Sequence, residues 1–167
     1  MGVPRLARRR RLDRRRRGGR HASAATGPVA NVNDAPTGLL AITGTATEDQ
    51  TLSADTSAIA DADGLGSFSV QWLRNGSSIA GATAGTYTLA DADVGTNISV
   101  QVSWTDGQGT AESLTSLAVG PVTNINDAPT GAAVVSGTAT EDQTLTAVTA
   151  SIADADGLGA FSYQWLR

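Results

Sequence analysis

The sequence predicts an all-β fold: a Greek-key β-sandwich of about seven strands, followed by part of a second unit of the same kind. Three observations predict it. Short runs of alternating apolar and polar residues recur at intervals of roughly 8–12 residues, which is typical of sandwich strands. Gly, Asp and Asn gather between these runs, as expected of turns. No stretch of the chain has the apolar period of a helix.

The chain contains a tandem repeat with a period of 93 residues. Residues 31–38 (NVNDAPTG) return as NINDAPTG at 124–131, and GTATEDQTL occurs in both copies without a gap. A period of this length corresponds to one whole domain per repeat. The expected boundaries are an Arg-rich segment at 1–22, the end of a preceding repeat and its hinge at 23–33, a complete unit at 34–126, and the first three strands of a second unit at 127–167.

The first half of the complete unit predicts three strands separated by polar turns. The third strand alternates most clearly, because Phe68, Val70 and Trp72 share one face while Ser and Gln residues occupy the other. Strands are expected at 38–43, 50–55 and 67–74, with a turn at 48–49 and a loop at 61–66.

The second half begins with Asn75-Gly76, a pair typical of a two-residue hairpin turn that needs positive φ at both positions. The longest expected strand then places Ile98, Val100, Val102 and Trp104 on one face. The remaining elements are strands at 78–79, 86–89 and 110–119, a corner at 91–95 and a turn at 106–109.

Positive charge is concentrated at the start of the chain. Residues 1–20 hold ten arginines and one acid, a net charge of +9, whereas the remaining 147 residues hold 2 arginines against 15 acids, a net charge of −13. Three interpretations of the Arg-rich segment compete: nucleic-acid binding, targeting to a membrane surface, and a frame slip or misassigned start in a longer repeat gene, of which the chain is a fragment. We favour the third, because the match between repeats stops abruptly before residue 23. In each case a segment with nothing to bury is expected to be disordered.

Composition excludes several kinds of chemistry. The chain has no Cys, which removes disulfides, thiol nucleophiles and thiolate metal sites. Its one His is His21, beside the Arg-rich segment, so a hydrolase triad has no candidate base. No apolar run is long enough to span a membrane. We therefore expect no catalytic residues, no enzyme activity and no membrane span.

Two segments carry a resemblance to immunoglobulin-like domains. Residues 71–76 (QWLRNG) resemble the strand with the buried Trp, and residues 87–100 resemble the corner and the strand after it. The chain departs from antibody domains at three positions. Ile98 replaces the corner Tyr, and Ala54 and Val100 stand near the two Cys positions, so the core is expected to depend on packing alone.

Residues 23–167 as a whole resemble the tandem immunoglobulin-like and cadherin-like repeats of large bacterial surface and secreted proteins, including calcium-binding adhesins of the RTX type. The hinge at 31–38, the GTATEDQTL segment and the WLR segment carry this resemblance. It implies a non-enzymatic structural or adhesion module located outside the cell or on the bacterial cell surface. Its implied partners are neighbouring repeats of the same chain and a ligand on a host or cell surface.

The resemblance also implies a Ca²⁺ site at each hinge, since cadherins bind Ca²⁺ there with acids of both flanking domains. The hinge here has Asn124 in place of an Asp and Ala128 in place of an Asn, which predicts weaker binding. The opposing interpretation is that these acids form turns, pair Asp93 with Arg74 and keep the chain soluble. The candidate ligands at the second hinge are Glu48, Asp49, Asp91, Asp93, Asn124, Asn126, Asp127, Asp154 and Asp156, and those at the first are Asn33, Asp34, Asp61 and Asp63.

Two other functions remain as alternatives. Nucleic-acid binding would use the Arg-rich segment, but the −13 charge of the remainder opposes contact with phosphate, so no nucleic-acid partner is expected. Carbohydrate binding would need Trp72 or Trp104 to be exposed, whereas both stand at the apolar phase of their strands and are expected in the core.

Overall fold

The computed structural model describes residues 27–167, and the Arg-rich segment with its expected disorder lies outside the described residues. Residues 27–31 and residues 32–167 belong to separate units of the chain. Residues 27–31 contain no strand, and all the named elements belong to the second unit. Within that unit, residues 34–126 are the first copy of the repeat and residues 127–167 the second copy.

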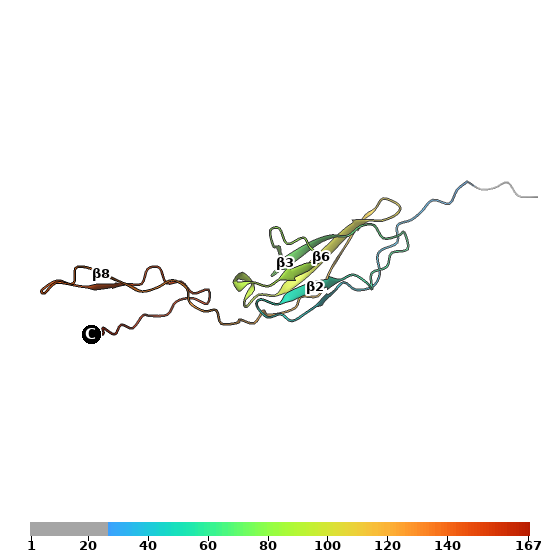
Figure 1. Cartoon of the computed structure of the whole chain (residues 1–167). Coiled ribbons are helices and arrows are strands. Elements are labelled where there is room, and N and C mark those ends of the chain that lie inside the picture. Colours follow the sequence, from blue (N-terminus) through green and yellow to red (C-terminus); the bar gives the residue numbers. More distant parts are fainter. Residues whose placement is uncertain (1–26) are drawn as a thin grey trace, which may run out of the picture. The chain divides into compact units, whose positions relative to one another are not determined.

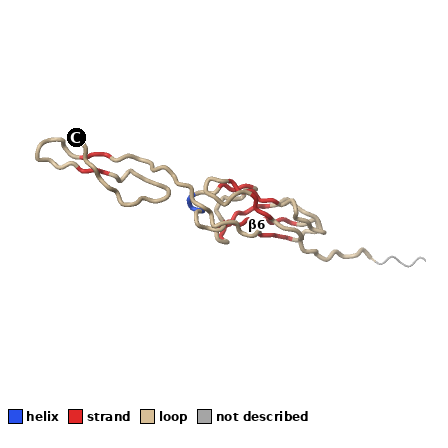
Figure 2. Tube along the Cα trace, turned by 90° about the horizontal axis from the view of Figure 1, so that it is seen from below, coloured by secondary structure: helices blue, strands red, loops and turns tan. Residues whose placement is uncertain are grey.

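The described residues are mostly β, with several antiparallel sheets, and the single 3-10 turn η1 is the one helical element among them (Figure 2). The elements are β1 (Ala41–Thr43), β2 (Thr51–Asp55), β3 (Ser69–Arg74), β4 (Ser77–Ser78), β5 (Thr86–Thr88), η1 (Asp91–Asp93), β6 (Ile98–Thr105), β7 (Ala111–Thr115), β8 (Val134–Ser136) and β9 (Thr146–Val148).

The first copy has two antiparallel sheets that share one core. One sheet has the order β1-β2-β5 and the other the order β4-β3-β6-β7, and Figure 1 shows β3 and β6 side by side with β2 in the other sheet. Leu52 on β2 is buried in the same cluster as Trp72 on β3 and Val100 on β6. Each buried Val or Leu side chain contributes about 1.5–3 kcal/mol, so these strands hold the two sheets together.

Register explains why the apolar residues of β3 and β6 meet in the core. Trp72 pairs with Val100 and Val70 pairs with Val102, so the apolar phases of both strands face the same side of the sheet. Trp72 stacks on Tyr87 with ring centroids 5.8 Å apart, and the rings of Trp104 and Phe68 are perpendicular, with centroids 5.3 Å apart. The expected core positions of Trp72 and Trp104 are confirmed, since they are 0% and 4% exposed.

The turn between β3 and β4 is also confirmed. Asn75 and Gly76 have φ values of 48° and 81°, the positive values that this hairpin turn requires at both positions. The Asn75 amide donates to the Asn97 carbonyl oxygen at 2.8 Å, and the Asn75 side chain accepts from the Asn97 amide at 2.9 Å. This turn therefore also holds the start of β6.

Several strands are shorter than the sequence predicts. The first strand, expected at 38–43, is limited to β1, because Gly38 has a φ of 88°, outside the range of a strand. The last strand, expected at 110–119, ends at Thr115, and beyond it the chain contacts β6 through the Ser116 amide, which donates to the Val100 carbonyl oxygen, and through a bridge between Val119 and Ile98. The alternation of apolar and polar residues extends beyond the ends of β1 and β7, but the regular pairing with the neighbouring strand does not.

The second copy repeats the first pair of strands. β8 pairs with β9 in the register of β1 with β2, since Val135 opposite Ala147 corresponds to Ile42 opposite Ala54. Residues 160–167, where the sequence predicts the counterpart of β3, form no ladder. In the first copy β3 is held by β4 and β6, and residues 127–167 contain no counterpart of either.

Within residues 27–167, helices long and apolar enough for a membrane crossing are lacking.

Candidate metal site at the second hinge

The second hinge is fixed to the first copy by its backbone. Val122 bridges Val94 and Thr123 bridges Thr47, both in parallel pairing. The Glu48 amide donates to the Thr123 carbonyl oxygen at 2.9 Å, and the Thr123 amide donates to the Ala46 carbonyl oxygen at 3.0 Å. These bonds place the hinge residues directly beside the turn at 48–49.

Glu48 is the buried member of the site, with 1% of its surface exposed. Its Oε2 accepts a hydrogen bond from the Ile125 amide at 3.0 Å, while its Oε1 is buried and accepts none from the described residues. A buried carboxylate oxygen without a donor is costly, typically about 1–3 kcal/mol or more for a charged group. This oxygen is therefore suited to a proton or a cation.

Three carboxylates converge at this point. Glu48, Asp91 and Asp127 each offer an oxygen, and these oxygens all lie within 4.8 Å of one another. They come from the turn at 48–49, from η1 and from the hinge itself. No Lys or Arg pairs with them among the described residues, because the one ion pair found there joins Arg74 to Asp93.

Repulsion within this cluster affects its protonation. The Ile125 amide lowers the pKa of Glu48, but burial, the direct side-chain interaction with the Asp91 carboxyl and the charges of Asp91 and Asp127 together outweigh it, so the pKa is raised above its usual value of 4.5. Burial raises the pKa of Asp127, and the charges of Asp91, Asp156, Asp49 and Asp154 raise it further. Close like charges and desolvation both disfavour the ionised forms, and a divalent cation would offset both effects.

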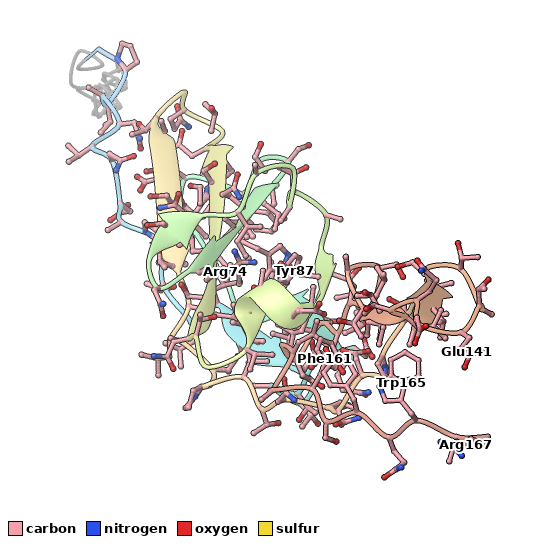
Figure 3. The ribbon with its side chains drawn as sticks, turned by 90° about the vertical axis from the view of Figure 1, so that its left-hand side faces the viewer. Arg74, Tyr87, Glu141, Phe161, Trp165 and Arg167 are labelled. Carbon is pink, nitrogen blue, oxygen red and sulfur yellow. The ribbon has the colours of Figure 1, made fainter. Side chains whose placement is uncertain are left out.

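Asp93 has a different role from the other acids of the predicted set. It is fully buried, and its Oδ1 lies 2.7 Å from both Nε and Nη2 of Arg74. Its Oδ2 accepts from the Tyr87 hydroxyl and the Ala90 amide, each at 2.9 Å. Arg74 and Tyr87 lie close together beside η1 (Figure 3). Both oxygens of Asp93 are thus engaged, Oδ1 by Arg74, in the pairing that the sequence allowed as an alternative, and Oδ2 by Tyr87 and Ala90.

Two acids of the second copy, Asp154 and Asp156, accept hydrogen bonds from backbone amides at or near the hinge. The Asp127 amide donates to Asp156 Oδ2 at 2.7 Å, and the Asp156 amide donates to Asp154 Oδ1 at 3.0 Å. Asp49 occupies a turn position with a φ of 61°. These contacts combine turn chemistry with a concentration of negative charge near Asp127.

The two amide candidates of the second hinge differ in their contacts. The Asn126 side chain donates to the Asp127 carbonyl oxygen at 2.9 Å. Asn124 is exposed. Neither belongs to the converging group of Glu48, Asp91 and Asp127.

The first hinge repeats half of this arrangement. The Asp34 amide donates to Asp63 Oδ2 at 2.7 Å and the Asp63 amide to Asp61 Oδ1 at 2.9 Å, which reproduces the bonds of Asp127, Asp156 and Asp154. Asn33 differs from its counterpart Asn126, because its side chain donates to Glu112 Oε1 at 2.8 Å. The first hinge has no counterparts of Glu48 and Asp91 in this sequence, so only the part of the arrangement formed by Asp34, Asp61 and Asp63 can be compared.

Asp106 is a buried acid that the sequence marked only as part of a turn. Its Oδ1 accepts from the amides of Gln108 and Thr110 at 2.8 and 2.7 Å, which fixes the turn between β6 and β7. Burial raises its pKa, but the hydrogen bonds from Thr110, Gln108 and Gly109 outweigh burial and hold the pKa below the usual value of 3.8. No local pattern indicated this burial, because Asp-Gly turns are commonly exposed.

Asp106 is expected to make the first copy sensitive to acid. A lowered pKa in the folded state stabilises the fold above the unfolded value of 3.8, and this stability is lost as the pH falls through the folded value. Urea unfolding measured from pH 7 to pH 2 should show a smaller loss of stability for Asp106→Asn than for the unaltered chain. Asp142→Asn, which changes an exposed acid of the second copy, is the control and should follow the unaltered chain.

Comparison of the chain with protein-family models, with curated proteins and with solved structures yields no match.

Proposed function

We propose that the chain is a non-enzymatic structural or adhesion module of a bacterial extracellular or cell-surface protein, built from immunoglobulin-like β-sandwich repeats whose hinges bind Ca²⁺. The 93-residue repeat supports the modular part of this proposal. The sheet orders β1-β2-β5 and β4-β3-β6-β7 support the sandwich, because they match two packed Greek-key sheets with the buried Trp on β3.

One observation carries the Ca²⁺ part of the proposal: the buried Oε1 of Glu48 lacks a hydrogen-bond donor among the described residues and belongs to a group of three carboxylates. Ca²⁺ prefers six to eight oxygen ligands from carboxylates, carbonyls and water. Glu48, Asp91 and Asp127 would supply the first of these, and backbone carbonyls and water the others. A site with only three carboxylate ligands is expected to bind Ca²⁺ with the millimolar affinity that is typical of extracellular modules.

The proposed role of the ion is mechanical. Glu48 and Asp91 belong to the first copy, Asp127 belongs to the hinge, and the Asp127 amide is bonded to Asp156 of the second copy. An ion held by all three carboxylates ties the hinge to the first copy and removes their mutual repulsion. The hinge then loses conformational freedom, which would stiffen a chain of such repeats for its contacts with neighbouring repeats or with a ligand on a cell surface.

Thermal unfolding of the full chain in EDTA and in Ca²⁺ tests this proposal. With Ca²⁺ at ten times its dissociation constant, binding adds about 1.4 kcal/mol, which should raise the Tm of the first copy by roughly 5–10 °C. Glu48→Gln should abolish the increase and should itself raise the Tm in EDTA, because it removes one of the three repelling charges.

Glu141→Gln is the matched control, since Glu141 is the exposed counterpart of Glu48 in the second copy (Figure 3). This variant should keep the full response to Ca²⁺. An unchanged Tm in Ca²⁺, with no heat on calorimetric titration, would remove the ion from the proposal and leave the acids as turn-forming and solubilising residues.

A further inference from the structure

The turn between β3 and β4 places a reactive pair of residues at an exposed position. Asn75 is the one Asn of the chain that is followed by Gly. Both residues of the pair are exposed, and apart from its chain neighbours no described residue lies within 4 Å of the place that a Cβ of residue 76 would occupy. An Asn carboxamide carbon can be attacked by the next backbone nitrogen, and Gly has no Cβ to hinder that approach. Asn75 is therefore the Asn of this chain that is most suited to such a reaction.

The folded turn keeps the two reacting atoms apart. The φ of 48° puts Asn75 in the left-handed region, where ψ is typically about +47°. At that ψ the Gly76 nitrogen points away from the Asn75 Cβ, whereas closure of a five-membered ring needs both on the same side of the Cα–C bond. The Asn75 Oδ1 also accepts from the Asn97 amide at 2.9 Å, which holds the carboxamide at the start of β6. The reaction therefore requires the turn to open.

The hairpin has few contacts that oppose its opening. β4 has only two residues, Ser77 and Ser78, and both are exposed. It lies at the edge of its sheet and pairs with β3 alone. Elements with little buried apolar surface open locally, at a lower free energy than the unfolding of the whole domain. The turn thus has a route to the reactive conformation that leaves the core strands in place.

We propose that Asn75 is a site of spontaneous covalent rearrangement, which the folded turn suppresses. In the open turn the Gly76 nitrogen forms a bond to Asn75 Cγ. The bond from Cγ to Nδ2 breaks, and Nδ2 leaves as ammonia with the proton that the Gly76 nitrogen gives up. Water then adds to one of the two carbonyl carbons of the succinimide ring and opens it, which leaves either Asp or isoaspartate at position 75. The only co-reactant is water.

The two products differ in their effect on the fold. Asp-Gly fits the same turn as Asn-Gly, and an Asp at position 75 keeps an oxygen that accepts from the Asn97 amide. Isoaspartate carries the chain through its Cβ and Cγ, which adds one atom to the backbone between Arg74 and Ser77, so these two residues lose their pairing register. Because the loss of ammonia is irreversible, chains with isoaspartate accumulate according to the time that the turn spends open.

Peptide mapping by mass spectrometry tests this proposal on the full chain after incubation at neutral pH. In urea above the unfolding midpoint, the mass change from amide to acid should appear at Asn75 before it appears at any other Asn. Without urea it should appear at Asn75 at least about tenfold more slowly, because only the small open fraction of the turn reacts.

Two variants test the chemistry and its consequence separately. Gly76→Ala should slow the reaction in urea by at least about fivefold, since the added Cβ hinders the attacking nitrogen and no folded structure is present to complicate the comparison. Asn75→Asp, the variant that matches the harmless product, should keep the urea midpoint of the unaltered chain. The isoaspartate fraction, isolated by chromatography, should have a lower midpoint.

Three outcomes would overturn the proposal. Equal rates with and without urea would show that the turn does not protect Asn75. Faster reaction at another Asn in urea would show that the Gly76 neighbour does not determine the site. An unchanged rate for Gly76→Ala in urea would show that the Gly76 nitrogen is not the attacking group.

Discussion

Trp72→Ala is expected to lower the free energy of unfolding of the first copy by about 3–5 kcal/mol. Trp72 is fully buried between the sheets, stacks on Tyr87 and donates its indole N–H to the Ala84 carbonyl oxygen at 2.9 Å. Truncating a buried aromatic side chain to Ala costs about 3–5 kcal/mol. Small domains have a total stability of about 5–15 kcal/mol, so this one change removes a large share of it. Urea unfolding followed by far-UV circular dichroism measures the loss.

The repeat provides the matched control for this experiment. Trp165→Ala removes the same side chain from the equivalent position of the second copy, where it is half exposed and lies outside any sheet. The urea midpoint of the first copy should stay unchanged. If Trp72→Ala and Trp165→Ala lower the urea midpoint equally, the loss of stability does not depend on the burial of Trp72 in the core.

Asp93→Ala is expected to cost about 2–4 kcal/mol of the stability of the first copy. The substitution removes the acceptor of the Tyr87 hydroxyl and of the Ala90 amide, and it leaves the Arg74 guanidinium without its partner. Breaking a buried ion pair by removal of one partner typically costs about 3–5 kcal/mol. The expected cost is lower here because the Arg74 side chain is 32% exposed and water partly replaces the lost carboxylate. Urea unfolding at pH 7 measures it.

Asp91→Ala is the control, since it removes an acid from the same 3-10 turn. Asp91 is exposed and belongs to the carboxylate group at the hinge, so in EDTA its removal relieves repulsion and should leave the urea midpoint unchanged or slightly higher. If both variants lose stability equally, the shape of the turn and not the ion pair with Arg74 is responsible.

The sequence predicted well those elements whose determinants are local. The alternation of residues 67–74 and 98–104 predicted β3 and β6, because one face of each strand is buried and the side-chain period of a strand is two. The hairpin turn at Asn75 and Gly76 was equally predictable, since positive φ at two consecutive positions strongly restricts the residues that fit.

The properties of the site depend on contacts between distant residues, which local patterns do not reveal. The sequence marked Glu48 as part of a polar turn, yet its side chain is buried because hinge residues 122–125 pack across it, more than 70 positions later. The resemblance to cadherin-like repeats also implied Asp93 as a metal ligand beside Asp91, whereas both of its oxygens accept hydrogen bonds from Arg74, Tyr87 and Ala90. Two acids on one turn have opposite environments, because one points into the domain and the other toward the hinge.

The pairing of residues 122–123 with the first copy has a consequence for tension along the chain. Two parallel bridges, Thr47 with Thr123 and Val94 with Val122, fasten this segment to the turn before β2 and to the residue after η1. A pull applied beyond residue 127 therefore loads these hydrogen bonds before it reaches β7. Hydrogen bonds of parallel pairs that are pulled along the strand direction share the load in shear. The domain therefore resists extension at residues 122–123, and the core strands are stressed only after these two bridges have broken.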